Sequence, residues 1–359
     1  MHCSTLNELP APPPGKTGWP WTEESPQLPG TMPDGSPWPS VSIVTPSLNQ
    51  RQFIEETIRS VLLQGYPDLE YIIIDGGSTD GSLEIIKKYE PWLAYRVSER
   101  DRGQSHAINK GWQRARGEIL AWLNSDDTYN PGAIRCAVEA LRANPGVGMV
   151  YSDMNYTDVS SKVIYRFRSQ PYEFHKLLLD NYVTQSTVFV RRGVLDAVGL
   201  LDETLHLIMD QEPWLRIGRR NAVSYLPGTV LANLRIYPET NSNRLLVVRW
   251  TEGLRLLDMV FADQTLPEAV RQLRRKEYGR CYMRLASALV EKERYNEVIP
   301  WLVRAVVTYP YQLRHEWFLC IRLLAETFLG TSGVRAVRLL RRLAREAWQK
   351  SIGPGRTYH

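Results

Sequence analysis

Strand and helix patterns alternate along residues 41–153, and this alternation limits the fold of the chain more than any other feature. Apolar runs such as Val41 to Thr45, Tyr71 to Asp75 and Glu118 to Leu123 have the length of buried strands. Amphipathic stretches such as Gln50 to Gln64 lie between them and have the periodicity of helices that cover a sheet. A later helix is predicted to begin after Asn130, whose side chain would be the N-cap. The pattern predicts an α/β fold in which a mostly parallel sheet carries helices on both faces.

Polar residues follow four of the predicted strands. Ligands of such sheets bind beyond the carboxyl ends of the strands, so these residues are the candidates for a functional site. Each group also has a structural interpretation, because Asp-Gly-Gly-Ser is typical of a turn between a strand and a helix, and an Asp pair often forms a cap. Together they suit a nucleotide diphosphate held through Mg²⁺ or Mn²⁺, since hard cations bind carboxylate oxygens and neutralise a diphosphate leaving group. The four groups are Pro46 to Asn49, Asp75 to Asp80, Asp101 to Gln104 and Asn124 to Asp127.

Composition and charge divide the chain into three predicted parts. Residues 1–40 are rich in Pro, Gly and Trp and predict an extended lead-in whose Trp side chains pack on the surface of the next domain. Residues 41–244 contain the α/β pattern and form the predicted catalytic domain, and residues 245–359 show helical periodicity alone. This last part has 20 Lys and Arg against 11 Asp and Glu, a balance of +9, which leaves −4 for the first 244 residues out of a net charge of +5.

Several classes of protein are excluded by the sequence. The four cysteines lie far apart without a C-x-x-C pair, so we expect neither a zinc site nor a disulfide framework. The N-terminus lacks the apolar core of a signal peptide, and no run of 18 apolar residues is present, which predicts a cytoplasmic protein. A Rossmann oxidoreductase would need G-x-G-x-x-G at the first turn between a strand and a helix. We expect no nucleic-acid partner.

Four ordered blocks resemble the signature of family 2 glycosyltransferases with the GT-A fold. The resemblance covers about residues 40 to 240 and depends on the order and the spacing of the blocks together. It implies a Rossmann-like catalytic domain and an inverting transfer of a sugar from a nucleotide-diphosphate donor to an acceptor hydroxyl. A glycan or lipid-linked acceptor in cell-surface polysaccharide or glycolipid assembly is the implied partner. The blocks are Val41-Ser-Ile-Val-Thr-Pro-Ser-Leu-Asn49, Ile74-Asp-Gly-Gly-Ser-Thr-Asp-Gly-Ser82, Asp101-Arg-Gly-Gln-Ser-His-Ala-Ile-Asn-Lys-Gly111 and Leu123-Asn-Ser-Asp-Asp127.

The resemblance also implies roles for individual residues on the donor side. Asp75 would approach the base or ribose, and Arg102 would lie near the diphosphate or the donor sugar. Asp126 and Asp127 would form the D-x-D-like motif, with Asp127 as the ligand of Mn²⁺ or Mg²⁺. The full set expected to bind the nucleotide sugar is Pro46, Asn49, Asp75, Gly76, Arg102, Gln104, Asn109 and Asp126.

Two positions depart from the pattern of the family. Many relatives have two carboxylates in succession after the second strand, but here Gly76 follows Asp75, which leaves the recognition of the base open. Relatives often complete the metal shell with a His further along the chain, where this sequence has Tyr237. We therefore expect weak metal affinity.

On the acceptor side, the run Leu205 to Arg216 resembles the block that contains the catalytic base of the family. Asp210 matches that base, because an inverting transfer needs a carboxylate that takes the proton from the acceptor hydroxyl. Asp210 also stands where an N-cap would begin the next helix, and the two roles are compatible. Arg216 would either orient Asp210 or face solvent. The residues expected to support the site are Glu212, Arg216 and Gln185.

The basic C-terminal part has two features. Tyr282 to Pro310 weakly resembles one degenerate tetratricopeptide-like hairpin, which cannot bury its apolar face alone. Gly333 to Lys350 has six basic residues and one acid and predicts an amphipathic helix, which would either bind an anionic membrane surface or pack on the helical module. An alternative function is a silent nucleotide-sugar-binding scaffold that acts through this module. Asp126, Asp127 and Asp210 argue against it, because a silent site has no need of them.

Overall fold

The computed structural model describes residues 4–237, 245–311 and 319–328. The described residues fall into two compact units on either side of the boundary between residues 244 and 245. Each unit is described separately. None of the described helices is both long enough and apolar enough to cross a bilayer.

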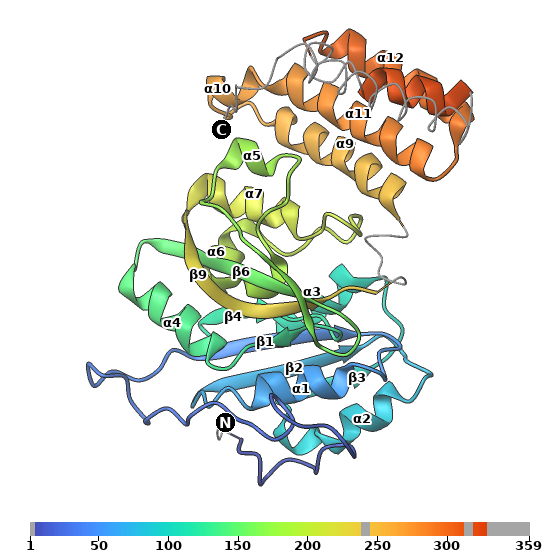
Figure 1. Cartoon of the computed structure of the whole chain (residues 1–359). Helices are drawn as coiled ribbons and strands as arrows, with labels where there is room; N and C mark the ends of the chain where they lie inside the picture. The colour runs from blue at the N-terminus through green and yellow to red at the C-terminus, as the bar shows by residue number, and fades with distance from the viewer. Residues whose placement is uncertain (1–3, 238–244, 312–318, 329–359) are drawn as a thin grey trace, which may run out of the picture. The chain divides into compact units, whose positions relative to one another are not determined.

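The first unit contains a mixed sheet of nine described strands in the spatial order β3-β2-β1-β4-β8-β6-β9-β5, with β7 beside β6 (Figure 1). Strands β3, β2, β1 and β4 are parallel, as the alternating pattern predicts. Strand β8 is antiparallel to both β4 and β6, and β7 forms an antiparallel pair with β6. The strands are β1 (Val41–Ser47), β2 (Leu69–Asp75), β3 (Tyr95–Ser98), β4 (Ile119–Trp122), β5 (Thr128–Tyr129), β6 (Val147–Thr157), β7 (Val163–Phe167), β8 (Phe189–Arg191) and β9 (Ala222–Arg235).

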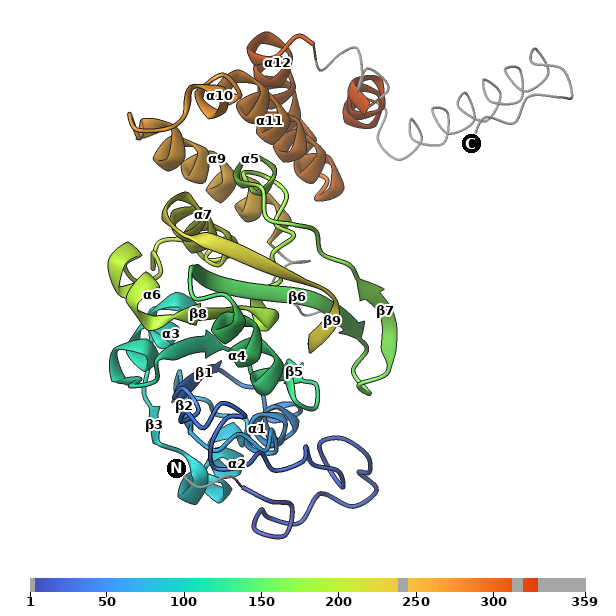
Figure 2. The same cartoon turned by 90° about the vertical axis from the view of Figure 1, so that its left-hand side faces the viewer.

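Helices cover both faces of this sheet, which confirms the predicted fold class. Helices α1, α2 and α4 lie on one face and α3, α6 and α7 on the other (Figures 1 and 2). All seven residues of β1 are buried, because the strand lies inside the sheet between the two layers of helices. The helices are α1 (Ile54–Leu62), α2 (Ser82–Lys88), α3 (Gln104–Arg114), α4 (Ala133–Ala143), α5 (Phe174–Leu177), α6 (Arg192–Val198) and α7 (Gln211–Arg220).

The start of α4 corrects one prediction. The helix begins at Ala133, after Gly132 in the left-handed conformation, so Asn130 is not its N-cap. The Asn130 amide instead donates a hydrogen bond to the Val230 carbonyl of β9 and accepts one from Asn233. The side chain therefore joins the end of β5 to β9.

The lead-in packs along the first unit, as its Trp content predicts. The Arg59 side chain of α1 is fully buried and donates hydrogen bonds to the carbonyls of Pro10, Pro20 and Trp21. The Trp19 indole donates to the carbonyl of Tyr129, which lies shortly after Asp126 and Asp127 in the chain. The lead-in is thus held by α1 and by strand β5, which follows the acid pair.

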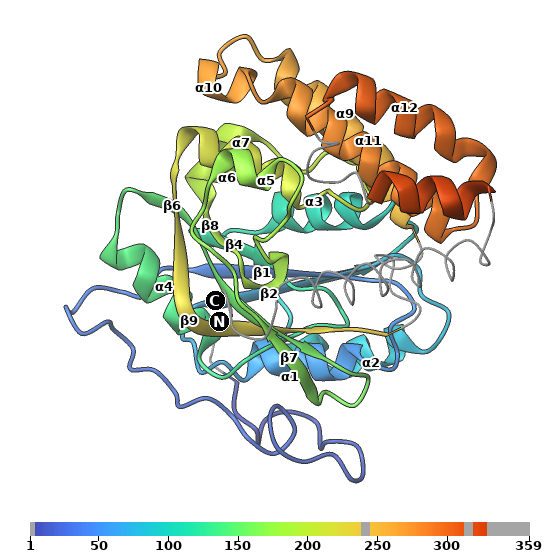
Figure 3. The same ribbon diagram turned by 45° about the horizontal axis from the view of Figure 1, so that its top comes forward.

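The described secondary structure of the second unit consists of helices alone. Its helices are α9 (Leu246–Ala262), α10 (Glu268–Arg271), α11 (Arg274–Glu291) and α12 (Val298–Thr308), and α11 packs against both α9 and α12 (Figure 3). Apolar side chains of α11 and α12 form its core, among them Leu285, Leu289, Val298 and Leu302. The basic segment at residues 333–350 lies outside the described residues.

Candidate active site

The two acidic side chains after β4 form the centre of the candidate site. Asp126 is partly buried and Asp127 is 2% exposed. One carboxylate oxygen of Asp127 accepts a hydrogen bond from the Ser186 hydroxyl at 2.8 Å, and the other accepts from the backbone N–H of Arg235 at 3.2 Å. Asp126 accepts from the Tyr237 hydroxyl at 2.8 Å. The position where relatives carry a metal-binding His therefore lies against the acid pair.

The electrostatics of the pair favour a bound cation. Burial raises the pKa of both carboxyl groups, and the charge of Asp126 raises the pKa of Asp127 further. Two neighbouring carboxylates in a desolvated site are costly when both are ionised, and a divalent cation removes that cost. The described residues contain no group of three or more His, Cys, Asp or Glu arranged as metal ligands. The pair fits a cation such as Mg²⁺, which takes one or two carboxylates and completes its shell with water and substrate phosphates.

Arg235, which the motifs do not mark, connects the acid pair to two other elements. Its guanidinium is 2% exposed and donates to the backbone carbonyl of Asp126 at 3.0 Å. It also pairs with the Glu56 carboxylate of α1 at 3.2 Å and donates to the Asp158 carbonyl in the β6–β7 turn. The signal in the sequence is an arginine at the end of β9 after the apolar residues of its second half, since an arginine is rarely buried without partners.

The loops after β1 and β2 are tied together at the same edge of the sheet. Pro46 lies on β1 opposite Ile74 of β2. Asn49 adopts a positive φ of 53°, its backbone N–H donates to the Ser78 hydroxyl, and its side-chain oxygen accepts from the N–H of Thr79. These bonds fix the shape of the loops where the sequence places the nucleotide.

The structure gives Asp75 a local role in the turn after β2. The side chain is 1% exposed and accepts hydrogen bonds from the backbone N–H groups of Gly77 and Ser78. It accepts two more from the hydroxyls of Ser78 and Ser98. Both carboxylate oxygens are therefore engaged by the protein, and Asp75 holds the Gly-Gly-Ser turn in place.

The start of α3 links the donor loops to the acceptor side. The Gln104 amide donates to the side-chain oxygen of Asn124 at 2.6 Å, directly before the acid pair in the chain. Asn109 exchanges two hydrogen bonds with the backbone of Leu201, at 2.9 Å and 3.0 Å. Helix α3 thus fixes the loop that leads to Asp210 relative to the loop that carries Asp126.

Arg102 lies at the surface beside these loops. Its side chain is 69% exposed and forms an ion pair of 2.5 Å with Glu203, which precedes Asp210 in the chain. Burial raises the pKa of Glu203, but the hydrogen bonds from Arg102 and Asn109 and the charge of Arg102 together hold this pKa below its usual value. An exposed ion pair contributes little to stability, so an anionic ligand can replace Glu203 at small cost.

On the acceptor side, Asp210 is the N-cap of α7. One of its oxygens accepts from the N–H of Gln211 and the other from the Asn181 amide, each at 2.8 Å. Glu212 and Arg216 form an ion pair of 2.6 Å on the first turns of the same helix.

Arg216 and Gln185 form hydrogen bonds to backbone carbonyls near the site. Arg216 donates to the carbonyls of Gly199 and Leu200 after α6 and so fixes the loop beyond that helix. The Gln185 amide donates to the carbonyl of Trp122 at the end of β4. Both side chains therefore stabilise the surroundings of the predicted base and of the acid pair.

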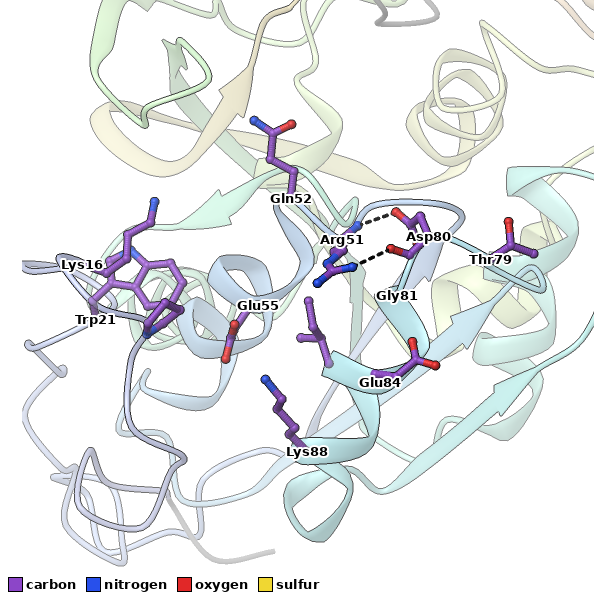
Figure 4. Close-up of a pocket in the computed structure, with 12 residues that line it drawn as sticks. Lys16, Trp21, Arg51, Gln52, Glu55, Thr79, Asp80, Gly81, Glu84 and Lys88 are labelled. Carbon is purple, nitrogen blue, oxygen red and sulfur yellow. Dashed lines mark hydrogen bonds between the residues drawn. The ribbon is translucent and has the colours of Figure 1, made fainter.

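A groove of about 590 Å³ opens beside Tyr237, which contacts the acid pair. A pocket of similar volume lies between the lead-in and helices α1 and α2 (Figure 4). The lining of that pocket mixes cations with carboxylates, among them Lys16, Lys88, Glu55 and Glu84, and so gives no net field for a diphosphate. The groove beside Tyr237 shares Arg51 and Asp80 with that pocket, and it differs by bordering the side chain that contacts Asp126. Its lining residues are Asn49, Gln50, Arg51, Gln52, Phe53, Asp80 and Tyr237.

Sequence comparisons match the region that contains these loops. A family model described as glycosyl transferase family 2 matches residues 42–199. A Rickettsia typhi protein described as an uncharacterized glycosyltransferase is 30% identical over 217 residues, which cover 58% of this chain and 67% of that protein. The putative teichuronic acid biosynthesis glycosyltransferase TuaG of Bacillus subtilis is 40% identical over 107 residues, which cover 29% of this chain and 42% of that protein.

Solved structures share the fold. S. aureus TarS 1–349 in complex with UDP-GlcNAc has a TM-score of 0.60 and 18% identity, over 85% of this chain and 92% of that one. The mannosyltransferase PcManGT of Pyrobaculum calidifontis, in complex with GDP-Man and Mn²⁺, has a TM-score of 0.54 and 19% identity, over 88% and 92%. The likeness confirms the GT-A fold. Because the matched sequence includes the loops that hold Asp75, Arg102 and the acid pair, the chain belongs to glycosyl transferase family 2 and is a glycosyltransferase.

Proposed function

We propose that the protein transfers a sugar from a nucleotide-diphosphate donor to an acceptor hydroxyl, with inversion at the anomeric carbon. The observation that carries the proposal is the meeting of two loops at α3, one with Asp126 and Asp127 and the other with Asp210. A donor bound at the first loop and an acceptor bound at the second would have their reacting atoms held together. TuaG is named for teichuronic acid biosynthesis, which supports a glycan or lipid-linked acceptor in cell-surface polysaccharide assembly.

On the donor side, Asp127 would hold Mn²⁺ or Mg²⁺, and Asp126 would hold the ribose. The cation would neutralise the negative charge that develops on the leaving diphosphate. Arg102 would add a second positive charge by exchanging Glu203 for a phosphate oxygen. Pro46, Asn49 and Gly76 would shape the loops around the nucleoside. A solved structure with this fold contains Mn²⁺, which supports the cation.

On the acceptor side, Asp210 would act as the general base. The acceptor oxygen attacks the anomeric carbon from the side opposite the diphosphate while its proton passes to a carboxylate oxygen of Asp210. The bonds from Gln211 and Asn181 fix the orientation of the carboxylate. Glu212 and Arg216 would hold the start of α7 and the loop after α6 in the arrangement that presents this base.

A donor-hydrolysis screen tests the proposal without an acceptor. The full chain is incubated with a panel of nucleotide sugars, with Mn²⁺ or with excess EDTA, and the free nucleotide is measured. We expect Mn²⁺-stimulated hydrolysis of one donor or of a few. A chain that binds donors but hydrolyses none would instead support the scaffold alternative, and full activity in EDTA would contradict the role of the cation.

A further inference from the structure

The space beside Gly76 is filled by a carboxylate from another loop. A Cβ atom at Gly76 would lie 2.6 Å from Oδ2 of Asp101 and 3.5 Å from a methyl carbon of Leu48. Gly76 is not among the glycines with a positive φ, so the backbone conformation does not require glycine here. The close approach of Asp101 explains why residue 76 is a glycine, since a Cβ atom there would clash with the carboxylate. A carboxylate oxygen from the loop after β3 thus occupies the space that a side chain at residue 76 would take.

One carboxylate oxygen of Asp101 accepts no hydrogen bond from the described residues, whereas each oxygen of Asp75 accepts at least one. Oδ1 of Asp101 accepts from the backbone N–H of Gly103 at 2.9 Å, which fixes the side chain. Within the described part of the chain, no hydrogen bond reaches Oδ2. Both oxygens of Asp75, in contrast, are used by the turn after β2. The oriented oxygen at this edge of the sheet therefore belongs to Asp101.

The surroundings of this oxygen suit a flat heterocycle. Leu48 follows β1 directly, lies against the same point and is 53% exposed. In the sheet order, β2 lies two strands away from β4, which is about 10 Å at the usual strand spacing. A nucleotide with its diphosphate at Asp127 therefore extends its base toward Leu48 and Asp101. The leucine offers apolar contact to the ring, and the carboxylate offers one acceptor to its edge.

We infer that Asp101 accepts a hydrogen bond from the Watson–Crick edge of the donor base and thereby selects uracil. This inference rests on the proposed donor site. Uracil presents a ring N–H between two carbonyl groups, and this single donor matches the single free oxygen. Guanine also presents a ring N–H, but with an amino group beside it that Oδ2 alone does not satisfy. Adenine and cytosine offer an amino donor, but the ring nitrogen beside it carries a lone pair that the carboxylate oxygen repels, so the site favours uracil over both.

The first test changes the acceptor to a donor. In Asp101→Asn the amide oxygen keeps the bond from Gly103, and the NH₂ group takes the place of Oδ2. Binding of UDP, GDP, CDP and ADP to the full chain with Mn²⁺ is measured by calorimetry. The wild-type chain should bind UDP most tightly. We expect UDP binding in the variant to weaken on the order of 10- to 100-fold, the range for a lost hydrogen bond to a charged group, while CDP binding improves.

The second test moves the carboxylate from residue 101 to residue 76. Gly76→Asp alone should weaken UDP binding, because the new side chain would clash with Asp101 and displace its carboxylate. Adding Asp101→Ala to Gly76→Asp empties that space and leaves one carboxylate there, so the preference for UDP over CDP should return. A residue that only supports the loop would not show this rescue. Glu99→Gln is the matched control, since Glu99 pairs with Lys110 at the surface nearby and should leave the preference unchanged.

Melting temperatures show that each variant is folded before binding is compared. UDP preference lost in Asp101→Asn and recovered in the exchanged variant would support the assignment. An unchanged ratio of UDP to CDP affinity in folded Asp101→Asn would overturn it and leave the proposed function intact. Failure of the wild-type chain to bind any of the four nucleotides would overturn both.

Discussion

Asp127 combines a proposed catalytic role with a structural one, and the choice of substitution separates them. Alanine would leave the buried Ser186 hydroxyl and the Arg235 N–H without their acceptor, at a cost of about 1–3 kcal/mol for each group. Asparagine can keep both partners but loses the charge that a cation requires. We expect Asp127→Asn to keep its melting temperature and to lose Mn²⁺-stimulated donor hydrolysis by on the order of 10²-fold. Normal hydrolysis in a folded variant would place the metal elsewhere.

Tyr237 allows the metal affinity to be predicted separately from metal dependence. Its hydroxyl binds Asp126, and replacing it by His would add an imidazole, which suits Mn²⁺ less than a carboxylate but still binds divalent metals. We expect Tyr237→His to lower the Mn²⁺ concentration for half-maximal hydrolysis several-fold. Tyr237→Phe removes the hydroxyl without adding a ligand and serves as the control. An equal Mn²⁺ requirement in the His and Phe variants would show that residue 237 is not at the metal.

Asp210 can be tested by separating chemistry from helix capping. Asparagine caps helices about as well as aspartate but cannot take a proton. We expect Asp210→Asn to lower transfer turnover by on the order of 10²-fold or more, with nearly unchanged UDP affinity and melting temperature. Asp210→Ala should also lose about 1 kcal/mol of stability, because the bond from Gln211 disappears. Normal turnover with a reduced melting temperature would leave Asp210 as a cap alone.

Among the elements, the lead-in depends on one buried side chain. Arg59 binds three backbone carbonyls of residues 10–21 and has no exposed surface. Lysine cannot reproduce the planar fork of donors, so Arg59→Lys should lower the free energy of unfolding by about 2–3 kcal/mol, the loss expected for unsatisfied buried carbonyls. Urea unfolding of the full chain measures the change. Arg135→Lys is the control, since Arg135 is half-exposed on α4 and should change stability by less than about 0.5 kcal/mol. Equal effects would show that the lead-in does not depend on Arg59.

The elements that could be predicted are those in which local pattern and packing agree. Strands β1, β2 and β4 are buried on both faces and read as apolar runs, so their type and parallel order follow from sequence. Strands β7 and β9 carry exposed and charged residues, and their antiparallel or long-range pairing has no local signal. The same distinction applies to the site. Motif spacing identifies the loops of Asp75 and Asp126, whereas the bonds that saturate Asp75 and the approach of Asp101 to Gly76 depend on loops that meet only in the folded chain.

At the scale of the whole molecule, positive charge is concentrated after residue 244, and its function is a separate question from catalysis. The segment from Gly333 to Lys350 contains six basic residues and one acid, with Arg335, Arg338 and Arg342 at helical spacings of three and four. It lies outside the described residues, so the prediction rests on the sequence. A basic amphipathic helix binds anionic lipid through apolar contact and about 1 kcal/mol for each cation near the surface. We therefore propose that this segment brings the enzyme to the cytoplasmic face of a membrane, where a lipid-linked acceptor would be reached.

Liposome flotation decides between membrane binding and packing on the protein. The full chain and a version that ends before Gly333 are floated with neutral vesicles and with vesicles that contain anionic lipid, at low and high salt. We expect only the full chain to float, only with anionic lipid, and less at high salt, because screening weakens the attraction of surface charges. A melting temperature for the shortened chain shows whether it remains folded. Equal flotation of both chains, or loss of folding on truncation, would assign the apolar side of the segment to contacts within the protein and would remove the reason to place the acceptor in a membrane.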